Sequence, residues 1–172
     1  YSDNGIEIPK RINISNVGCS MLDSMWLAYI RVTGPYATSS SPQTTNSPWQ
    51  ILLKAMQLRR VRLESPRYVG VCHDDPQITS DEDIRFDAGV IVSKEYKGDS
   101  LIRVRELKAG PYIVARHVGT VQQLTESYEY LLNEWIANTP YQLRNEPLFE
   151  VYHNTDPNDD GGIDVRIPIV MR

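Results

Sequence analysis

Apolar and polar residues alternate along this chain with the period of strands, and this pattern recurs several times. Runs rich in β-branched and aromatic residues, bounded by glycine, proline or acidic turns, indicate where the strands lie. They predict strands at residues 26–33, 67–73, 84–92, 101–107, 112–118, 148–153 and 164–170. Pro168 cannot donate to a sheet ladder, so we expect its strand to lie at an edge or to carry a bulge. Residues 1–18 show no clear period and are interpreted as a lead-in segment.

Two other segments have the spacing of helices. Ser47-Pro48, after a polar loop at 37–47, is a favourable helix start, because serine caps the first turn and proline fits within it. One apolar helix face follows in each of two places. The first is Trp49, Leu52, Leu53 and Met56, and the second, in a helix expected around 125–138, is Tyr128, Leu131, Leu132 and Trp135.

The order of elements is repeated, and so are parts of the sequence. Residues 66–76 resemble residues 147–157 at an offset of 81 residues, and residues 83–86 align with residues 164–167 at the same offset. Upstream, Arg31-Val32-Thr33-Gly34 resembles Arg116-His117-Val118-Gly119. The repeat predicts an α+β fold with two strand-helix-strand-strand modules, at about 19–95 and about 99–172. We expect an antiparallel sheet with both helices on one face, forming one domain over 19–172 with a central ligand cleft.

Composition narrows the class of protein. A net charge of −4 argues against a nucleic-acid surface, which needs a basic patch. Cys19 and Cys72 lack metal or redox spacing, and the sequence has neither a membrane-spanning run nor a signal peptide. We therefore expect a cytoplasmic protein. The chain starts at Tyr1 rather than methionine, so a domain upstream is an open expectation.

Glu150 is the sharpest candidate for a functional residue. It lies in an apolar strand, and at the offset of 81 residues its counterpart is Val69. A buried carboxylate is costly unless a cation or a hydrogen-bond donor meets it. Two plainer interpretations stay open, namely that Glu150 faces solvent at a sheet edge or that it pairs with Arg166.

Aromatic residues are the second signal. Ten tyrosines and three tryptophans accompany only two phenylalanines, which favours rings that carry a polar group. Tyr36, Trp49, Tyr68 and Tyr152 are expected near the cleft, where their faces can attract a cation. For any single ring, ordinary core packing is the alternative.

The sequence has no motif that is specific for a metal site or for catalysis. Residues 156–161 match the first half of a calcium loop, but position twelve is Ile167 and strands flank the loop, so we reject a calcium site. His73, His117 and His153 lie on separate strands, which argues against zinc. No cofactor is predicted, and standard enzyme signatures are absent from the sequence.

Several of these segments together resemble the GyrI-like effector-binding domain, which occurs in AraC-type transcription regulators and also alone. The segments that carry the resemblance are residues 28–36, 68–76, 84–90, 110–119, 147–152 and 164–169. The likeness covers about 20–171. The longer loop at 37–47 and Thr120-Val121, where many members keep Pro-Tyr, depart from the family pattern.

The resemblance implies a pseudo-twofold pair of modules around a central cleft. It also implies a binding module for bulky, hydrophobic cations rather than an enzyme. In it Glu150 is the anionic anchor, and Trp49 and Tyr68 line the same cleft. Two alternatives follow from relatives of the fold. One is a hydrolase of electrophilic small molecules, with Glu150 as general base and Tyr152 orienting water. The other is a protein-binding inhibitor of the gyrase-inhibitor type. A homodimer is a further open expectation.

Overall fold

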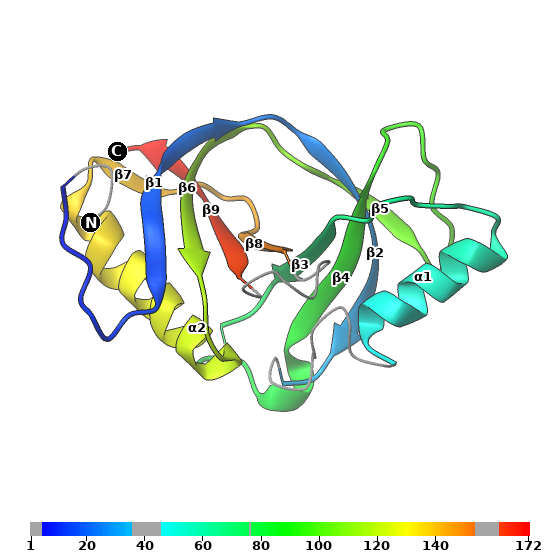
Figure 1. Cartoon of the computed structure of the whole chain (residues 1–172), viewed down its shortest axis with the longest axis horizontal. Helices are drawn as coiled ribbons and strands as arrows, with labels where there is room; N and C mark the ends of the chain where they lie inside the picture. The colour runs from blue at the N-terminus through cyan, green and yellow to red at the C-terminus, as the bar shows by residue number, and fades with distance from the viewer. Residues whose placement is uncertain (1–4, 36–45, 76, 154–161) are drawn as a thin grey trace.

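The computed structural model describes residues 5–35, 46–75, 77–153 and 162–172 (Figure 1). The fold is α+β, as the sequence predicts. The strands are β1 (Ile14–Leu22), β2 (Met25–Thr33), β3 (Tyr68–Cys72), β4 (Arg85–Val92), β5 (Arg103–Leu107), β6 (Gly110–His117), β7 (Tyr141–Leu143), β8 (Phe149–Tyr152) and β9 (Ile163–Met171). The helices are α1 (Pro48–Leu58), α2 (Val121–Glu129), the π-helix η3 (Tyr130–Trp135) and two short 3-10 turns, η2 (Asp81–Asp83) and η4 (Ile136–Asn138).

The strands form one antiparallel sheet in the order β1-β6-β9-β8-β3-β4-β2-β5, and β7 pairs with the end of β9. This order is symmetric. Read from the other end, it is the same if β1 is exchanged with β5, β2 with β6, β3 with β8 and β4 with β9. The central contact is between β3 and β8, one strand from each half. Figure 1 shows α1 and α2 toward the two ends of the sheet, with β3 and β8 between them.

Helix α1 begins where the sequence predicts. The Ser47 hydroxyl accepts a hydrogen bond from the Gln50 N–H, and Pro48 lies in the first turn. Its apolar face buries Trp49, Leu52 and Met56 against strands β2, β3 and β4. At roughly 1.5–3 kcal/mol for each large apolar side chain removed from water, this contact holds the helix on the sheet.

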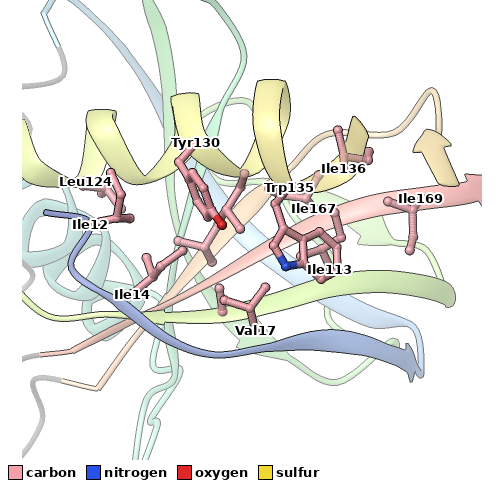
Figure 2. Close-up of a cluster of buried hydrophobic side chains, with 13 residues drawn as sticks. Ile12, Ile14, Val17, Ile113, Leu124, Tyr130, Trp135, Ile136, Ile167 and Ile169 are labelled. Carbon is pink, nitrogen blue, oxygen red and sulfur yellow. The ribbon is translucent and has the colours of Figure 1, made fainter. Parts of the chain in front are cut away.

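Helix α2 begins at Val121, earlier than the residue 125 expected from apolar spacing. Thr120 and Gln123 form a reciprocal capping box, which stabilises the first turn before the apolar face starts. The helix continues as η3, and together they bury Leu124, Leu131 and Trp135 against β6 and β9. Figure 2 shows this cluster, to which Ile14 and Val17 of β1 also contribute.

A third cluster lies on the sheet face away from the helices. Its members include Val69 and Val71 of β3, Phe149 and Val151 of β8, and Tyr112 of β6. The central strands are therefore buried on both faces, which explains the nearly continuous apolar runs at 68–72 and 148–152.

Two expectations about single segments are wrong. Residues 14–18 belong to β1 and the core rather than to a lead-in. The sequence pattern missed this segment because few of its residues are apolar, but its backbone pairs with β6 all the same. Strand β9 is an interior strand, not an edge. Pro168 is tolerated because it lies beyond the last β8 pair, at Arg166, and before the first β7 pair, at Ile169.

The strand register also corrects the predicted alignment of the two halves. Arg31 faces Asp87 across β2 and β4, and Arg116 faces Asp164 across β6 and β9. His73 and His153 each donate a backbone hydrogen bond to the returning strand at 3.2 Å. His73 therefore corresponds to His153, and three residues earlier Gly70, not Val69, corresponds to Glu150. A one-residue slip in a strand exchanges its two faces, so Val69 corresponds instead to Phe149.

Candidate functional site

Glu150 lies at the middle of the sheet face that carries both helices. One row of paired residues crosses the sheet as Ile30, Ala88, Gly70, Glu150, Val165 and Ala115. The first two pack beneath α1 and the last two beneath α2. Residues in one such row point to the same face, so both helices and the Glu150 side chain share it. The carboxylate therefore lies between the two helix-covered cores.

The Glu150 carboxylate is buried and bonded to neutral groups. Its Oε1 accepts from the Tyr128 hydroxyl at 2.9 Å, and its Oε2 accepts from the Tyr152 hydroxyl at 2.6 Å. The Cys72 thiol lies 3.6 Å from Oε1. The residue is 3% exposed, and Arg166 stacks over Phe149 on the opposite face. Both plainer interpretations, a solvent-exposed edge and a pair with Arg166, are therefore wrong.

Burial dominates the electrostatics of this group, which we call the Glu150 cluster: Glu150, Tyr128, Tyr152 and Cys72. Desolvation raises the pKa of Glu150, and the hydrogen bonds from Tyr152, Tyr128 and Cys72 oppose that rise. Burial, followed by the charge of Glu150, raises the pKa of Tyr128 and of Tyr152 well above that of a free phenol. Both tyrosines therefore stay protonated and act as donors.

Aromatic rings extend the cluster toward α1. Trp49 is fully buried, donates its indole N–H to the Val69 carbonyl at 3.1 Å and meets the Tyr152 ring edge-on at 5.0 Å. Tyr68 is the cross-strand partner of Tyr152 and packs in the same core as Trp49. Burial raises the pKa of the Tyr68 phenol.

The structure brings together four of the five site residues proposed from the sequence: Glu150, Trp49, Tyr68 and Tyr152. Tyr36 lies outside the described residues. Tyr128 and Cys72 were missed as site residues. The repeat already placed Tyr128 at the helix position of Trp49, which was the one signal for it, whereas nothing local in the sequence distinguishes Cys72.

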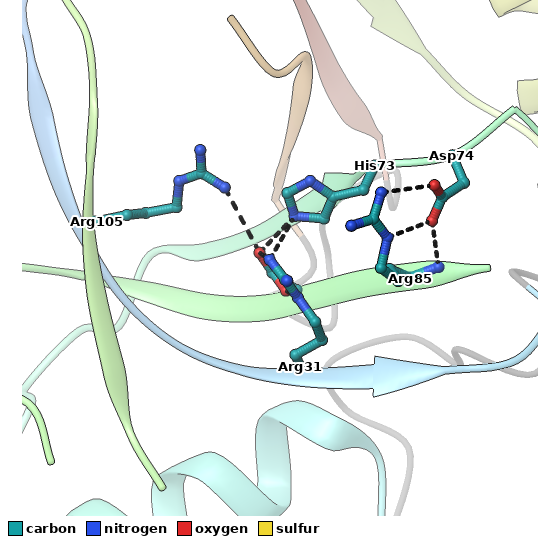
Figure 3. A network of polar contacts seen from close by, with 6 residues as sticks. Arg31, His73, Asp74, Arg85 and Arg105 are labelled. Carbon is teal, nitrogen blue, oxygen red and sulfur yellow. Dashed lines mark hydrogen bonds and ion pairs between the residues drawn. The ribbon is translucent and has the colours of Figure 1, made fainter. Parts of the chain in front are cut away.

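Away from this cluster, two similar charge networks tie strands together on the other sheet face. In the first, Asp87 accepts from Arg31 at 2.7 and 3.0 Å and contacts His73 at 2.5 Å, while Arg105 lies 3.6 Å away (Figure 3). In the second, His153 contacts Asp164 at 2.7 Å, and Arg116 lies 3.6 Å from the same carboxylate.

These networks account for two of the three histidines. The third, His117, is buried and within 3.0 Å of the Ser127 hydroxyl. Across the part of the chain that the structure describes, no group of three or more acidic, histidine or cysteine side chains could hold a metal ion. The loop at 156–161 lies outside that part. None of the described helices is long and apolar enough to span a membrane.

Comparisons with known proteins find sequence relatives along most of this chain. The protein YosT of Bacillus subtilis, named as a prophage-derived transcriptional regulator, is 27% identical over 148 residues, which cover 86% of this chain and 95% of YosT. A DNA gyrase inhibitor of Escherichia fergusonii is 26% identical over 138 residues, covering 73% of this chain and 87% of that protein.

Solved structures show the same fold at low sequence identity. The C-terminal domain of EcmrR has a TM-score of 0.66 at 14% identity, covering 91% of this chain and 98% of that domain. SAV2435 bound to tetraphenylphosphonium has a TM-score of 0.55 at 16% identity, covering 91% of this chain and 94% of SAV2435. The family model described as the GyrI-like small molecule binding domain matches residues 19–170. With the family model spanning nearly the whole sequence, this chain belongs to the GyrI-like small-molecule-binding domain family.

Proposed function

We propose that this chain binds a hydrophobic, aromatic cation between its two helices, with Glu150 as the anionic anchor. The observation that carries the proposal is the buried carboxylate itself. Among the described residues, the groups bound to it are two phenols and a thiol, none of which carries a positive charge. A ligand cation would supply the charge that these donors cannot.

The surrounding rings suit such a ligand. Tyr152 donates to the carboxylate on the α1 side, where Trp49 and Tyr68 adjoin Tyr152. Tyr128 donates to the carboxylate from α2. Aromatic faces attract a desolvated cation by up to about 2 kcal/mol each. The solved structure of SAV2435 with tetraphenylphosphonium shows a protein of this fold holding a cation of that class.

The test uses two ions of nearly equal shape and opposite charge, tetraphenylphosphonium and tetraphenylborate, followed by the fluorescence of the tryptophans. We expect the cation to bind and the anion to bind far more weakly. Glu150→Gln should weaken cation binding by roughly 30-fold or more, because it removes one partner of a buried charge pair. Glu126→Gln removes the same charge from an exposed position on α2 and should leave binding unchanged. Equal affinity for both ions would contradict the proposal.

We further propose that binding serves regulation, in a single domain that includes the whole of β1 and is located in the cytoplasm. Relatives named as transcriptional regulators support this role. Inhibition of gyrase by protein contact is the alternative that the E. fergusonii relative suggests. Pull-down of gyrase subunits with the purified chain, with and without the cation, would separate the two. Size-exclusion chromatography of the same sample would test a homodimer.

Hydrolysis is a second candidate function. A buried glutamate whose pKa is raised, 2.6 Å from a tyrosine hydroxyl, has the geometry of a general base with an orienting donor. Two neighbours of this fold are named as hydrolases of Listeria innocua, at 11% and 12% identity. Turnover of an epoxide- or cyclopropane-bearing substrate, lost in Glu150→Gln, would favour this function over binding alone.

A further inference from the structure

Two arginines stack on an aromatic pair on the sheet face opposite Glu150. The guanidinium carbon of Arg144 lies 4.9 Å from the Tyr112 ring centre, and that of Arg166 lies 5.8 Å from the Phe149 ring centre. The two rings meet edge-on at 5.6 Å. The four side chains are therefore contiguous. A guanidinium that stacks on a ring can still direct its N–H edge at another group.

Several of these N–H groups have no acceptor. The Nε of Arg166 and the Nε and Nη2 of Arg144 are buried and make no hydrogen bond to any described residue. Leaving a buried donor unsatisfied costs about 1–3 kcal/mol, and more when the group is charged. Burial lowers the pKa of Arg166, the charge of Asp164 opposes that shift, and the nearby Arg67 adds to it.

The neighbouring carboxylates already contact other side chains. Asp164, on the same strand as Arg166, contacts His153 at 2.7 Å and lies 3.6 Å from Arg116. Glu146, two residues from Arg144, pairs with Lys108 at 3.0 Å. Positive charge is therefore in surplus at the Tyr112–Phe149 pair, although the whole chain has a net charge of −4.

We propose that Arg144 and Arg166 form an anion-binding site for a small molecule that carries a carboxylate or phosphate group. The planar guanidinium fork matches the oxygens of both groups in a bidentate manner. A small anion fits better than a macromolecular surface, because the unsatisfied N–H groups are recessed. Phe149 and Glu150 are adjacent in β8 and point to opposite faces, so the sheet separates this site from the Glu150 cluster.

The test follows the arginine Nε–Hε resonances of the ¹⁵N-labelled chain during titration with sodium phosphate, against sodium chloride at equal ionic strength. The resonances of Arg144 and Arg166 should shift and saturate, while that of the exposed Arg62 should not. A parallel titration with sodium acetate distinguishes carboxylate from phosphate recognition. If all arginine resonances drift together without saturation, phosphate is an adventitious ion only and the proposal fails.

Variants provide the second measurement. Arg144→Gln and Arg166→Gln should each weaken binding of the preferred anion by about tenfold or more, and Arg62→Gln should not. Arg166→Lys keeps the charge but loses the fork, so it tests the geometry if the glutamine variant unfolds. Glu150→Gln should leave anion binding intact, which keeps this site distinguishable from the proposed cation site. Unchanged affinity in both arginine variants would overturn the proposal.

Discussion

Gly70 is the residue that makes room beside Glu150, because it is paired directly with it across β3 and β8. A Cβ atom at position 70 would lie 2.6 Å from Cζ of Phe86 and 3.2 Å from a ring carbon of Tyr152. Both rings are packed in the α1 core, so neither can swing freely away. The acid of the second half thus faces a position in the first half that tolerates no side chain.

We expect Gly70→Ala to destabilise the fold by about 1–3 kcal/mol, as added volume in a packed core does, and to disturb the Tyr152–Glu150 bond. Urea unfolding measures the first effect and cation affinity the second. Adding Phe86→Leu removes the ring atoms that the methyl group meets and should recover part of the stability. A Gly70→Ala variant as stable as the parent chain would contradict the close packing.

His117 provides a test based on pH. It is fully buried, and desolvation lowers its pKa below that of a free imidazole. The folded state then holds fewer protons than the unfolded state once the pH falls below about 6.5. The stability that the neutral imidazole maintains is therefore complete above that pH and declines as the pH falls toward the folded pKa.

Urea unfolding at about pH 7.5 and about pH 5.5 measures this loss. In His117→Asn, which keeps a polar group beside Ser127, the difference in unfolding free energy between the two pH values should be smaller. The same difference in both proteins would show that other groups cause the acid sensitivity.

At the scale of elements, one carboxylate in each half of the sheet links three neighbouring strands. Asp87 links β2, β3 and β4 through Arg31 and His73, and Asp164 links β6, β8 and β9 through Arg116 and His153. The two differ in burial, since the Asp87 side chain is 0% exposed and that of Asp164 is 20% exposed. Burial alone would raise the pKa of Asp87, but hydrogen bonds from His73 and Arg31 lower it overall.

We expect Asp87→Asn to destabilise the chain by up to about 3–5 kcal/mol, because it removes the buried charge with which the partly buried Arg31 and Arg105 pair. Asp164→Asn should cost about half of that or less, since solvent reaches that network. Chemical denaturation of the two variants side by side makes the comparison. Equal losses would mean that burial does not set the strength of these networks.

The two main helices show which features of an element local sequence patterns can predict. The start and apolar face of α1 follow from Ser47, Pro48 and the spacing of its apolar residues. The start of α2 was placed too late, because its capping box precedes the apolar face that the periodicity detects. The predicted strands lie within a few residues of the observed ones, but β1 and the three-residue β7 were not predicted. The first half of β1 has too few apolar positions to stand out.

At the scale of the whole molecule, cation binding should be linked to protons. Burial raises the pKa of Glu150 in the free chain, and a bound cation would lower it again. Binding would then release protons, so affinity should increase as the pH rises through the pKa of the free state. Calorimetric titration of tetraphenylphosphonium in two buffers of different ionisation enthalpy measures the proton release. Absence of release, together with a pH-independent affinity, would contradict a shifted Glu150.

The sequence by itself determined the fold class, the two main helices and most of the strands, and it singled out Glu150 as the candidate acid. Each of these depends on local signals, namely apolar periodicity, capping residues and one charge in an apolar run. The family resemblance also depends on short motifs in order along the chain, and the family model confirms it. The central ligand cleft stays a prediction.

Only the tertiary structure decided which residues surround that acid. Pairing by sequence offset set Glu150 against Val69, whereas the strand register sets it against Gly70 and places Tyr128, Tyr152 and Cys72 around its oxygens. The same register moves Arg166 to the other face, over Phe149. Register cannot be read from a repeat with loops of unequal length, and a slip of one residue exchanges the two faces of a strand.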